Sequence, residues 1–217
     1  MGRNALDAAA LAYQGLGLLR QQLPVSDRIH AIIDSGGQTP NLIPQTASLH
    51  INIRSRYAPT LRALSHRIED VLHGAALMAG VQADIHWDSS PMTMPVRSNQ
   101  TLGQRWVLAQ REIGRNPYPA GTISDTLAAS TDFGNISLRL PGIHPLIQIA
   151  PEGTGLHTAE FAAAAQSPRA EEAALDGAYG LAVVALDFLT DDALAADVQA
   201  EFEKAGGAVQ VQTYFDS

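Results

Sequence analysis

The chain of 217 residues contains no cysteine. This absence excludes disulfide bonds, cysteine-ligated zinc sites and a thiol nucleophile. Aromatic residues make up only 6% of the chain, and the 14 Lys and Arg residues are outnumbered by 22 Asp and Glu residues. The resulting net charge of −8 and the pI near 5.2 argue against nucleic acid or an anionic membrane surface as the main partner.

Long apolar runs and targeting signals are also missing. No uninterrupted apolar stretch approaches the roughly 18 residues that a membrane span requires. Residues 1–7 contain no basic segment followed by an apolar stretch, as a secretory signal would. Gly2 is not followed by Ser or Thr at position 6, which disfavours myristoylation. We therefore expect a cytoplasmic protein without a membrane partner. Apolar residues still make up 46% of the chain, which is enough for one large or two small cores.

The pattern of residues 1–88 predicts a small α+β domain. Apolar residues recur at helical spacing in residues 4–22 and between Pro59 and Gly80, whereas residues 30–37, 47–54 and 81–87 have the character of strands. The order helix, strand, strand, helix, strand equals a ferredoxin-like βαββαβ unit without its first strand. We expect this incomplete unit to form the first domain.

Residues 89–217 predict a second domain of the α/β class. A helix is expected around residues 102–113, a strand at residues 144–150, and two helices at residues 168–189 and 191–205. In the first of these two helices, one apolar stripe is expected to face the core of the domain. It consists of Ala174, Ala178, Leu181 and Val184. Alternating strands and helices indicate part of a layered α/β domain.

His157 is the strongest candidate for chemistry. It lies in a glycine-containing loop, residues 152–160, after the predicted strand and before a helix. Ligands of open α/β sheets bind beyond the carboxyl ends of strands. An imidazole at this place suits Zn²⁺ or Mn²⁺. The alternative is a loop histidine that caps the helix or contacts water.

Other polar residues have both a structural and a functional interpretation. Asp132, next to Thr131, is expected to cap the helix that holds Ile136, and a carboxylate that orients a metal ligand is compatible with that role. Arg54 could bind a carboxylate with both arms of its guanidinium, and Asn41 could polarise a carbonyl. The simpler interpretation of Arg54 is an exposed side chain on an edge strand, and that of Asn41 is a residue that forms a turn.

Several common site patterns are not found. The remaining histidines show neither HxH nor HExxH spacing, no glycine-rich phosphate loop follows a strand, and no serine lies in a G-x-S-x-G elbow. Nucleotide binding and serine hydrolysis are therefore poorly supported.

Four segments in order resemble the zinc aminoacylase/glutamate carboxypeptidase family of metallopeptidases. The resemblance is strongest to its amidohydrolase branch, which is p-aminobenzoyl-glutamate hydrolase-like. The segments are Gly2-Arg-Asn-Ala-Leu-Asp-Ala8; Gly36-Gly37 with Asn41-Leu-Ile-Pro44 and Asn52-Ile-Arg54; Ser130-Thr-Asp-Phe-Gly-Asn-Ile-Ser137 with Pro141-Gly-Ile-His-Pro145; and His157-Thr-Ala-Glu-Phe161. The match extends to about residue 190.

This resemblance implies a catalytic α/β domain with two metal ions, Zn or Mn, and a ferredoxin-like lid through which the protein forms a homodimer. In that family a metal-bound water attacks an amide carbonyl and a Glu acts as general base. His157 falls on the last metal ligand. Asn41 and Arg54 fall on lid positions that reach the substrate's carbonyl and carboxylate across the dimer. Gly153 and Gly155 fall on a loop whose amides approach the substrate.

The family's other metal ligands, its general base and its first lid strand would precede residue 1. We therefore expect the C-terminal portion of a hydrolase that acts on N-acyl amino acids or dipeptides with a free carboxylate. Alone, this portion is expected to bind metal weakly and to be inactive, because a catalytic zinc takes three protein ligands and a water. The alternative hypothesis is a non-catalytic dimerisation module built on residues 1–88.

Overall fold

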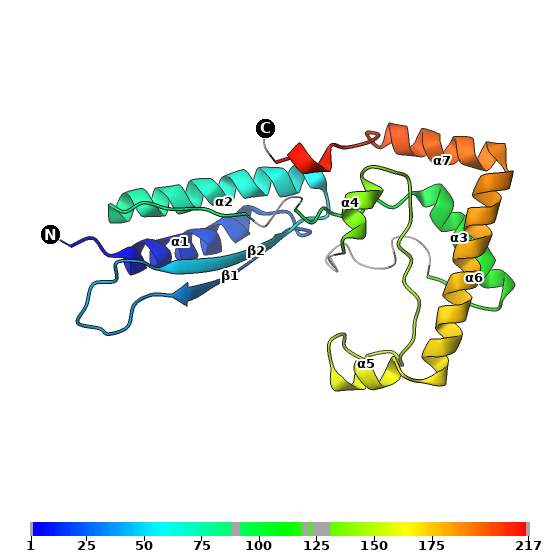
Figure 1. The fold of residues 1–217 in the computed structure, drawn as a ribbon, viewed down its shortest axis with the longest axis horizontal. Helices are drawn as coiled ribbons and strands as arrows, with labels where there is room; N and C mark the ends of the chain where they lie inside the picture. The colour runs from blue at the N-terminus through cyan, green and yellow to red at the C-terminus, as the bar shows by residue number, and fades with distance from the viewer. Residues whose placement is uncertain (1, 88–91, 119–121, 123–130, 216–217) are drawn as a thin grey trace. The chain divides into compact units, whose positions relative to one another are not determined.

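The computed structural model describes residues 2–87, 92–118, 122 and 131–215 (Figure 1). The chain divides into two compact units, residues 1–95 with 123–134 and 210–217, and residues 96–122 with 135–209. Helices are combined with a small two-stranded sheet, which agrees with the predicted α/β class. The boundary between residues 88 and 89, and the assignment of a lid and a catalytic domain, stay predictions.

The first unit contains the helices and strands predicted for residues 4–80. They are α1 (Ala5–Leu19), the 3₁₀ turn η1 (Arg20–Gln22), β1 (Arg28–Ser35), β2 (Ser48–Arg54) and α2 (Ala58–Ala79), with a further 3₁₀ turn η2 (Val211–Thr213) near the C-terminus. The side chain of Asn4 caps α1 by accepting a hydrogen bond from the Leu6 amide at 3.0 Å. Gly80 ends α2 with φ of 68°, a left-handed conformation that glycine adopts without strain.

β1 and β2 form an antiparallel pair in which apolar residues face the two helices. Ile29 lies opposite Ile53 and Ala31 opposite Ile51. This face packs into a core with buried residues of both helices: Leu16, Leu19, Leu64 and Ile68. The other face of β2 carries His50, Asn52 and Arg54, all exposed, as the alternation predicts.

The prediction of a strand at residues 81–87 is wrong in one respect, because this segment has no hydrogen-bonded strand partner in the described sheet. Its burial nevertheless alternates as in a strand, with Val81, Ala83, Ile85 and Trp87 half-buried and the residues between them exposed. Trp87 fixes the end of the segment to α2, since its Nε1 donates a hydrogen bond to Oε1 of Glu69 at 2.6 Å. A ladder needs a neighbouring edge, and β2 pairs only with β1 in the sheet that the described residues form.

The second unit is mainly helical. It contains α3 (Gln100–Glu112), α5 (Ala159–Ala164), α6 (Pro168–Thr190) and α7 (Asp192–Lys204), while the short α4 (Phe133–Ser137) crosses the boundary between the units. Leu102, Trp106, Val184 and Val198 form its core. The helices α3, α6 and α7 lie where the sequence predicts them.

The predicted inward face of α6 is wrong for three of its four residues. Ala174, Ala178 and Leu181 are not buried, and only Val184 is. The buried stripe instead consists of Ala173, Gly180 and Val184. At Gly180 an added Cβ would lie 2.4 Å from Nε2 of Gln110 and 2.8 Å from Nε1 of Trp106, so the absence of a side chain permits this close packing.

The strand predicted at residues 144–150 is also not a ladder strand in the described structure. Burial alternates here too: Ile147 and Ile149 are partly buried, whereas Leu146 and Gln148 are more exposed. Ile147 packs toward Gly177 of α6, with its Cδ1 4.0 Å from the place of a Cβ. The segment has the burial pattern of a strand without a neighbour to pair with.

Glu201 connects α7 to the beginning of α3. Its carboxylate accepts hydrogen bonds from the Gln100 amide at 2.5 Å, the Thr101 amide at 2.9 Å and the Thr101 hydroxyl at 2.7 Å. Burial raises the pKa of Glu201, but these hydrogen bonds together outweigh burial and hold the pKa below its usual value. The N-terminus of α3 thus receives a compensating negative charge.

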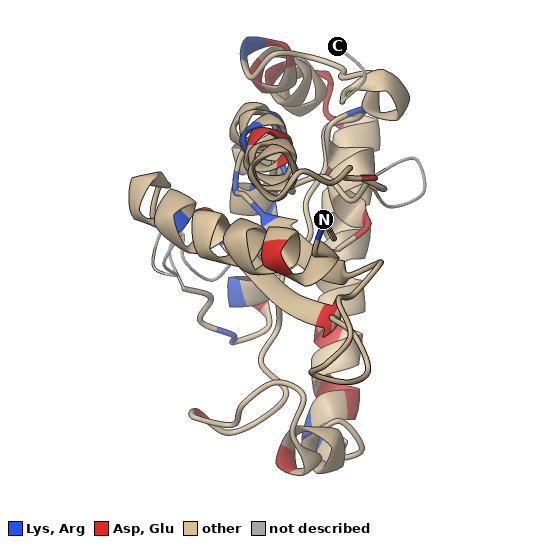
Figure 2. Ribbon diagram, turned by 90° about the vertical axis from the view of Figure 1, so that its left-hand side faces the viewer, with Lys and Arg blue, Asp and Glu red and all other residues tan. Residues whose placement is uncertain are grey.

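Among the described helices, α6 alone is long and apolar enough to cross a membrane by length and composition. The sequence contains no uninterrupted apolar run of this length, because acidic residues interrupt α6 (Figure 2). The mean hydropathy of α6 is nevertheless high enough for a span. Two of these residues form ion pairs within the second unit, Asp176 with Arg115 and Asp187 with Arg105. These pairs attach α6 to other residues of the second unit, and length and composition alone are weak evidence for a membrane span.

Candidate functional site

The loop that carries His157 leads from residues 144–150 into α5. Thr158 caps this helix, because its Oγ1 accepts a hydrogen bond from the Phe161 amide at 3.2 Å. The same hydroxyl donates to the Gly155 carbonyl oxygen at 2.9 Å and thereby closes the turn. His157 lies one residue before the cap and is exposed. The alternative that the histidine itself caps the helix is therefore excluded.

The backbone of His157 is left-handed. Of the non-glycine residues in the described part of the chain, it alone has a positive φ, 63°. This conformation costs an L-residue about 1–2 kcal/mol, although His adopts it more often than most residues do. Glycine would adopt it without the cost. An exposed imidazole held in this conformation points to a use for the side chain.

The two glycines of the loop lie on the same turn. Gly153 has φ of 85°, so its position favours glycine. A Cβ at Gly155 would lie 3.3 Å from Cγ2 of Thr158, a tight contact. Both residues are exposed. The approach of their amides to a substrate stays a prediction.

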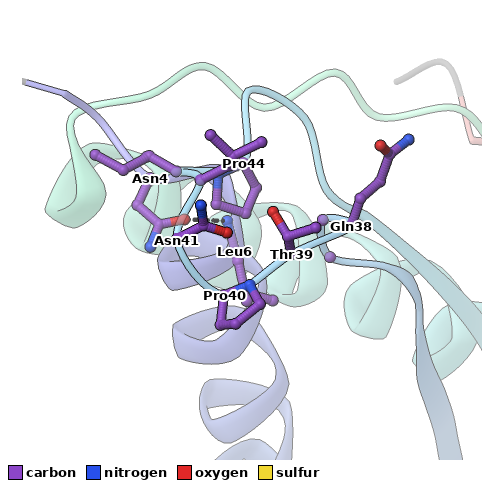
Figure 3. Close-up of a pocket in the computed structure, with 11 residues that line it drawn as sticks. Asn4, Leu6, Gln38, Thr39, Pro40, Asn41 and Pro44 are labelled. Carbon is purple, nitrogen blue, oxygen red and sulfur yellow. Dashed lines mark hydrogen bonds between the residues drawn. The ribbon is translucent and has the colours of Figure 1, made fainter.

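Asn41 lies in the loop between β1 and β2, which closes over the first turn of α1. Residues 36–44 of this loop, together with Asn4 and Leu6, enclose a pocket of about 410 Å³ (Figure 3). The loop is attached to the helix where the Ala5 amide donates to the Pro44 carbonyl oxygen at 3.1 Å. Asn41 is exposed at this pocket. The sequence gives Asn4 and Leu6 only as part of the motif at residues 2–8. Their contact with the loop before β2 was not predicted, since a contact between distant segments has no local signal.

Arg54 lies at the other end of the hairpin. It is the last residue of β2, it is exposed, and its Nε donates to Oδ1 of Asn52 at 3.3 Å. Ser48 and Arg54 are six residues apart, and at about 3.3 Å per residue the strand separates them by roughly 20 Å. Asn41 belongs to the loop that precedes Ser48. The structure therefore does not bring Asn41 and Arg54 of one chain together.

Thr131 and Asp132 precede α4, which begins at Phe133 as expected. The hydroxyl of Thr131 accepts a hydrogen bond from the Phe133 amide at 3.3 Å and is also 3.3 Å from Oδ1 of Asp132. The contact to the helix amide thus comes from Thr131 and not from Asp132. Ser130 lies outside the described residues. Because Asp132 belongs to the first unit and His157 to the second, the expected orientation of the metal ligand stays a prediction.

Two other residues of this motif have structural roles. A Cβ at Gly134 would lie 1.7 Å from the backbone oxygen of Met94, so only glycine permits this approach. The hydroxyl of the buried Ser137 accepts a hydrogen bond from the Arg97 amide at 3.0 Å. The motif therefore carries packing constraints independently of any chemistry.

The described residues do not by themselves fit a metal ion. Within these parts of the chain, no three His, Asp or Glu side chains gather closely enough to hold one. A catalytic zinc takes three protein ligands and a water, and His157 supplies one imidazole. Any complete metal centre that includes His157 requires ligands beyond those that the described residues bring together.

Comparisons with known proteins identify relatives of the chain, although no family model matches it. The chain is 36% identical to the Xaa-Arg dipeptidase of Mus musculus over 202 residues, which cover 93% of the chain and 46% of that protein. The Homo sapiens Xaa-Arg dipeptidase is 34% identical over 202 residues, with the same shares covered. The chain is a homologue of amidohydrolases and peptidases.

A third relative is bacterial. It is a component of the p-aminobenzoyl-glutamate hydrolase of Escherichia coli, and it is 25% identical over an alignment of 255 positions, gaps included, that covers 94% of the chain and 53% of that protein. The family resemblance drawn from the four motifs is thus confirmed. The chain spans about half the length of the curated relatives it matches.

Proposed function

We propose that the chain is the C-terminal portion of a metal-dependent amidohydrolase that cleaves N-acyl amino acids or dipeptides with a free carboxylate. Homology to two Xaa-Arg dipeptidases over 93% of the chain supports the reaction class. The observation that carries the site is His157, which is exposed and left-handed at the entrance of α5. This portion is inactive alone, because it holds one ligand of the metal centre.

The predicted residues around His157 have the following roles in this proposal. His157 would hold zinc or manganese as one of several ligands, and the metal would supply an activated water for attack on the amide carbonyl. Thr131 and Asp132 orient this ligand. The amides of Gly153 and Gly155 bind the substrate beside it.

Arg54 and Asn41 bind two different groups of the substrate. The guanidinium of Arg54 pairs with the free carboxylate, and the amide of Asn41 donates to the carbonyl oxygen. β2 spans roughly 20 Å at about 3.3 Å per residue, and Arg54 is its last residue whereas Asn41 precedes its first. We therefore assign both residues to a homodimer, in which the lid positions reach the substrate across the dimer.

The test is hydrolysis by a completed enzyme. The part of mouse Xaa-Arg dipeptidase that precedes its matched region is fused to this chain, and cleavage of a dipeptide with C-terminal arginine is measured with added Zn²⁺ or Mn²⁺. We expect turnover by the folded fusion and none by the chain alone. His157→Ala should lower kcat/KM by about 10³-fold or more, since it removes a metal ligand. His66→Ala, an exposed histidine of α2, is the matched control and should retain activity.

The alternative is the non-catalytic dimerisation module. It predicts a dimer of the isolated chain in light scattering and a folded fusion whose turnover does not respond to His157→Ala. Equal kcat/KM values for the two histidine variants would therefore reject the hydrolase proposal.

A further inference from the structure

Two arginines lie directly opposite each other on the outer face of the hairpin. Arg28 is the first residue of β1 and Arg54 the last residue of β2, and the antiparallel register pairs them. Directly opposite residues point to the same face of a sheet, with Cα atoms about 4.5–5.5 Å apart. This face is turned away from the helices, because the neighbouring Ile29 and Ile53 pack into the core. We call Arg28 and Arg54 the arginine pair.

The arginine pair is electrostatically unfavourable by itself. Like charges directly opposite one another destabilise a sheet. The chain has 22 Asp and Glu residues against 14 Lys and Arg residues, so an opposed pair of cations is not a consequence of its composition. An anion that accepts hydrogen bonds from both guanidinium groups would offset the repulsion.

Arg28 is held in place by the loop before β1. Its Nη1 donates to the backbone oxygens of Val25 and Asp27, the latter at 2.8 Å. These two bonds use both hydrogens of Nη1, whereas Nε and Nη2 of Arg28 have no acceptor among the described residues. The side chain is half-buried. A guanidinium that is already fixed through one nitrogen loses little conformational freedom when its other nitrogens bind an anion.

Arg54 is oriented by Asn52, two residues earlier on the same face of β2. Nε of Arg54 donates to Oδ1 of Asn52 at 3.3 Å. Because Oδ1 accepts this bond, the amide of Asn52 has its Nδ2 hydrogens to offer to a ligand. The outer face therefore carries hydrogen-bond donors of Arg28, Arg54 and Asn52 on neighbouring positions of the two strands.

The acidic residues near the two ends of β1 do not pair with Arg28. The carboxylate of Asp27 is buried, and its Oδ1 accepts hydrogen bonds from the hydroxyls of Ser26 at 3.1 Å and Ser55 at 2.7 Å. Asp34 is six residues from Arg28, which is roughly 20 Å along the strand at about 3.3 Å per residue. Within the described residues, Arg28 forms hydrogen bonds to backbone oxygens and no ion pair.

We propose that Arg28 binds the free carboxylate of the substrate together with Arg54, and that Asn52 donates a further hydrogen bond to it. A carboxylate has two oxygens and about four acceptor sites, so it can accept from both guanidinium groups. Arg28 thereby determines specificity, because a substrate whose C-terminus is blocked as an amide lacks the charge that both arginines bind. The inference rests on the proposed role of Arg54, and it adds a residue that lies outside the four motifs.

The test measures binding of a small carboxylate to the full chain by NMR. The probes are N-acetyl-L-alanine and N-acetyl-L-alaninamide at equal ionic strength, since they differ only in the carboxylate. The Nε–H resonances of ¹⁵N-labelled arginines report contact with the probe. We expect N-acetyl-L-alanine to shift the resonances of both Arg28 and Arg54 and the amide to shift neither.

Charge-removing variants separate the arginine pair from other cations. Arg28→Gln should raise the Kd of N-acetyl-L-alanine about threefold or more, the effect of losing one exposed ion pair. Arg67→Gln removes the same charge from an exposed position of α2, which packs on the other face of the hairpin, and should leave the Kd unchanged.

The outcomes distinguish this inference from the proposed function. A titration of the wild-type chain in which N-acetyl-L-alanine shifts Arg54 but not Arg28 overturns the inference, and this result does not depend on how any variant folds. An unchanged Kd in Arg28→Gln, or an equal loss in Arg67→Gln, also overturns it. In these cases weaker binding by Arg54→Gln would still support the proposed role of Arg54, whereas an unchanged Kd in that variant would contradict both.

Discussion

The indole nitrogen of Trp87 donates a hydrogen bond to the carboxylate of Glu69 at 2.6 Å. This contact fixes residues 81–87 against α2 although the segment has no strand partner in the described sheet. We expect Trp87→Phe to destabilise the first unit by about 1–2 kcal/mol, because a hydrogen bond to a charged group is lost. Hydrogen exchange in residues 81–87 should accelerate. The control is His86→Ala, since His86 is highly exposed beside Asp84; an equal acceleration in this variant would contradict the role of Trp87.

The close packing at Gly180 gives a second prediction. Gly180→Ala should lower the free energy of unfolding by about 1–3 kcal/mol, because the new methyl group meets the fully buried Gln110 and the indole of Trp106. Gly177→Ala lies one turn earlier on α6 and meets only Ile147 at an ordinary distance. It should stabilise the helix by about 0.5–1 kcal/mol. Urea unfolding of both variants tests this, and a shift of the same sign in both would refute it.

Glu201 gives a prediction with a defined pH dependence. Its pKa in the folded chain lies below the ordinary value of 4.5, so its contribution to stability is complete above that value and is lost as the pH falls through the folded pKa. Glu201→Gln should cost about 1–2 kcal/mol near neutral pH. The difference between wild type and variant should shrink below the ordinary pKa. Unfolding curves at about pH 7 and about pH 3, on either side of that pKa, test this. A difference that does not change with pH would show that the negative charge of Glu201 does not contribute to stability.

At His157, which has a left-handed backbone, replacement of the side chain is expected to affect stability and the proposed metal binding differently. His157→Gly should raise the free energy of unfolding or leave it unchanged, because it relieves about 1–2 kcal/mol of backbone strain. The offsetting cost of glycine's larger unfolded-state entropy is about 0.4–1 kcal/mol. His157→Ala keeps the strain and should be no more stable than wild type. Thermal unfolding of the three chains is the measurement, and a marked loss of stability in the glycine variant would indicate a packing role for the imidazole.

Local signals account for the elements that the sequence predicts well. α1 and α2 have apolar spacing and clear ends, at Asn4 and Gly80, and the alternation of residues 47–54 yields β2 with the expected exposed face. Residues 81–87 and 144–150 have the same alternation and yet form no ladder in the described structure. A ladder depends on a neighbouring strand, and local pattern does not report whether one is present.

The face of α6 shows a different reason for error. Alanines lie on several sides of this helix, so apolar spacing fits the stripe through Ala174 as well as that through Ala173. The packing of Gly180 against Trp106 decides between them, and this contact joins distant segments. In the site, the loop and helix that hold His157 could be predicted from turn and cap residues. The separation of Asn41 from Arg54 follows from the length of the predicted strand, whereas the pocket that Asn41 shares with Asn4 and Leu6 could not be predicted, because it joins distant segments.

The most direct test of the central claim is the metal content of the fusion with the mouse N-terminal part. After dialysis against Zn²⁺ or Co²⁺, the folded fusion should bind two ions per chain, whereas the His157→Ala fusion should bind fewer and show an altered Co²⁺ absorption spectrum. The His66→Ala fusion should match the parent. Two tightly bound ions with an unchanged spectrum in the His157→Ala fusion would contradict the assignment of this imidazole as a metal ligand.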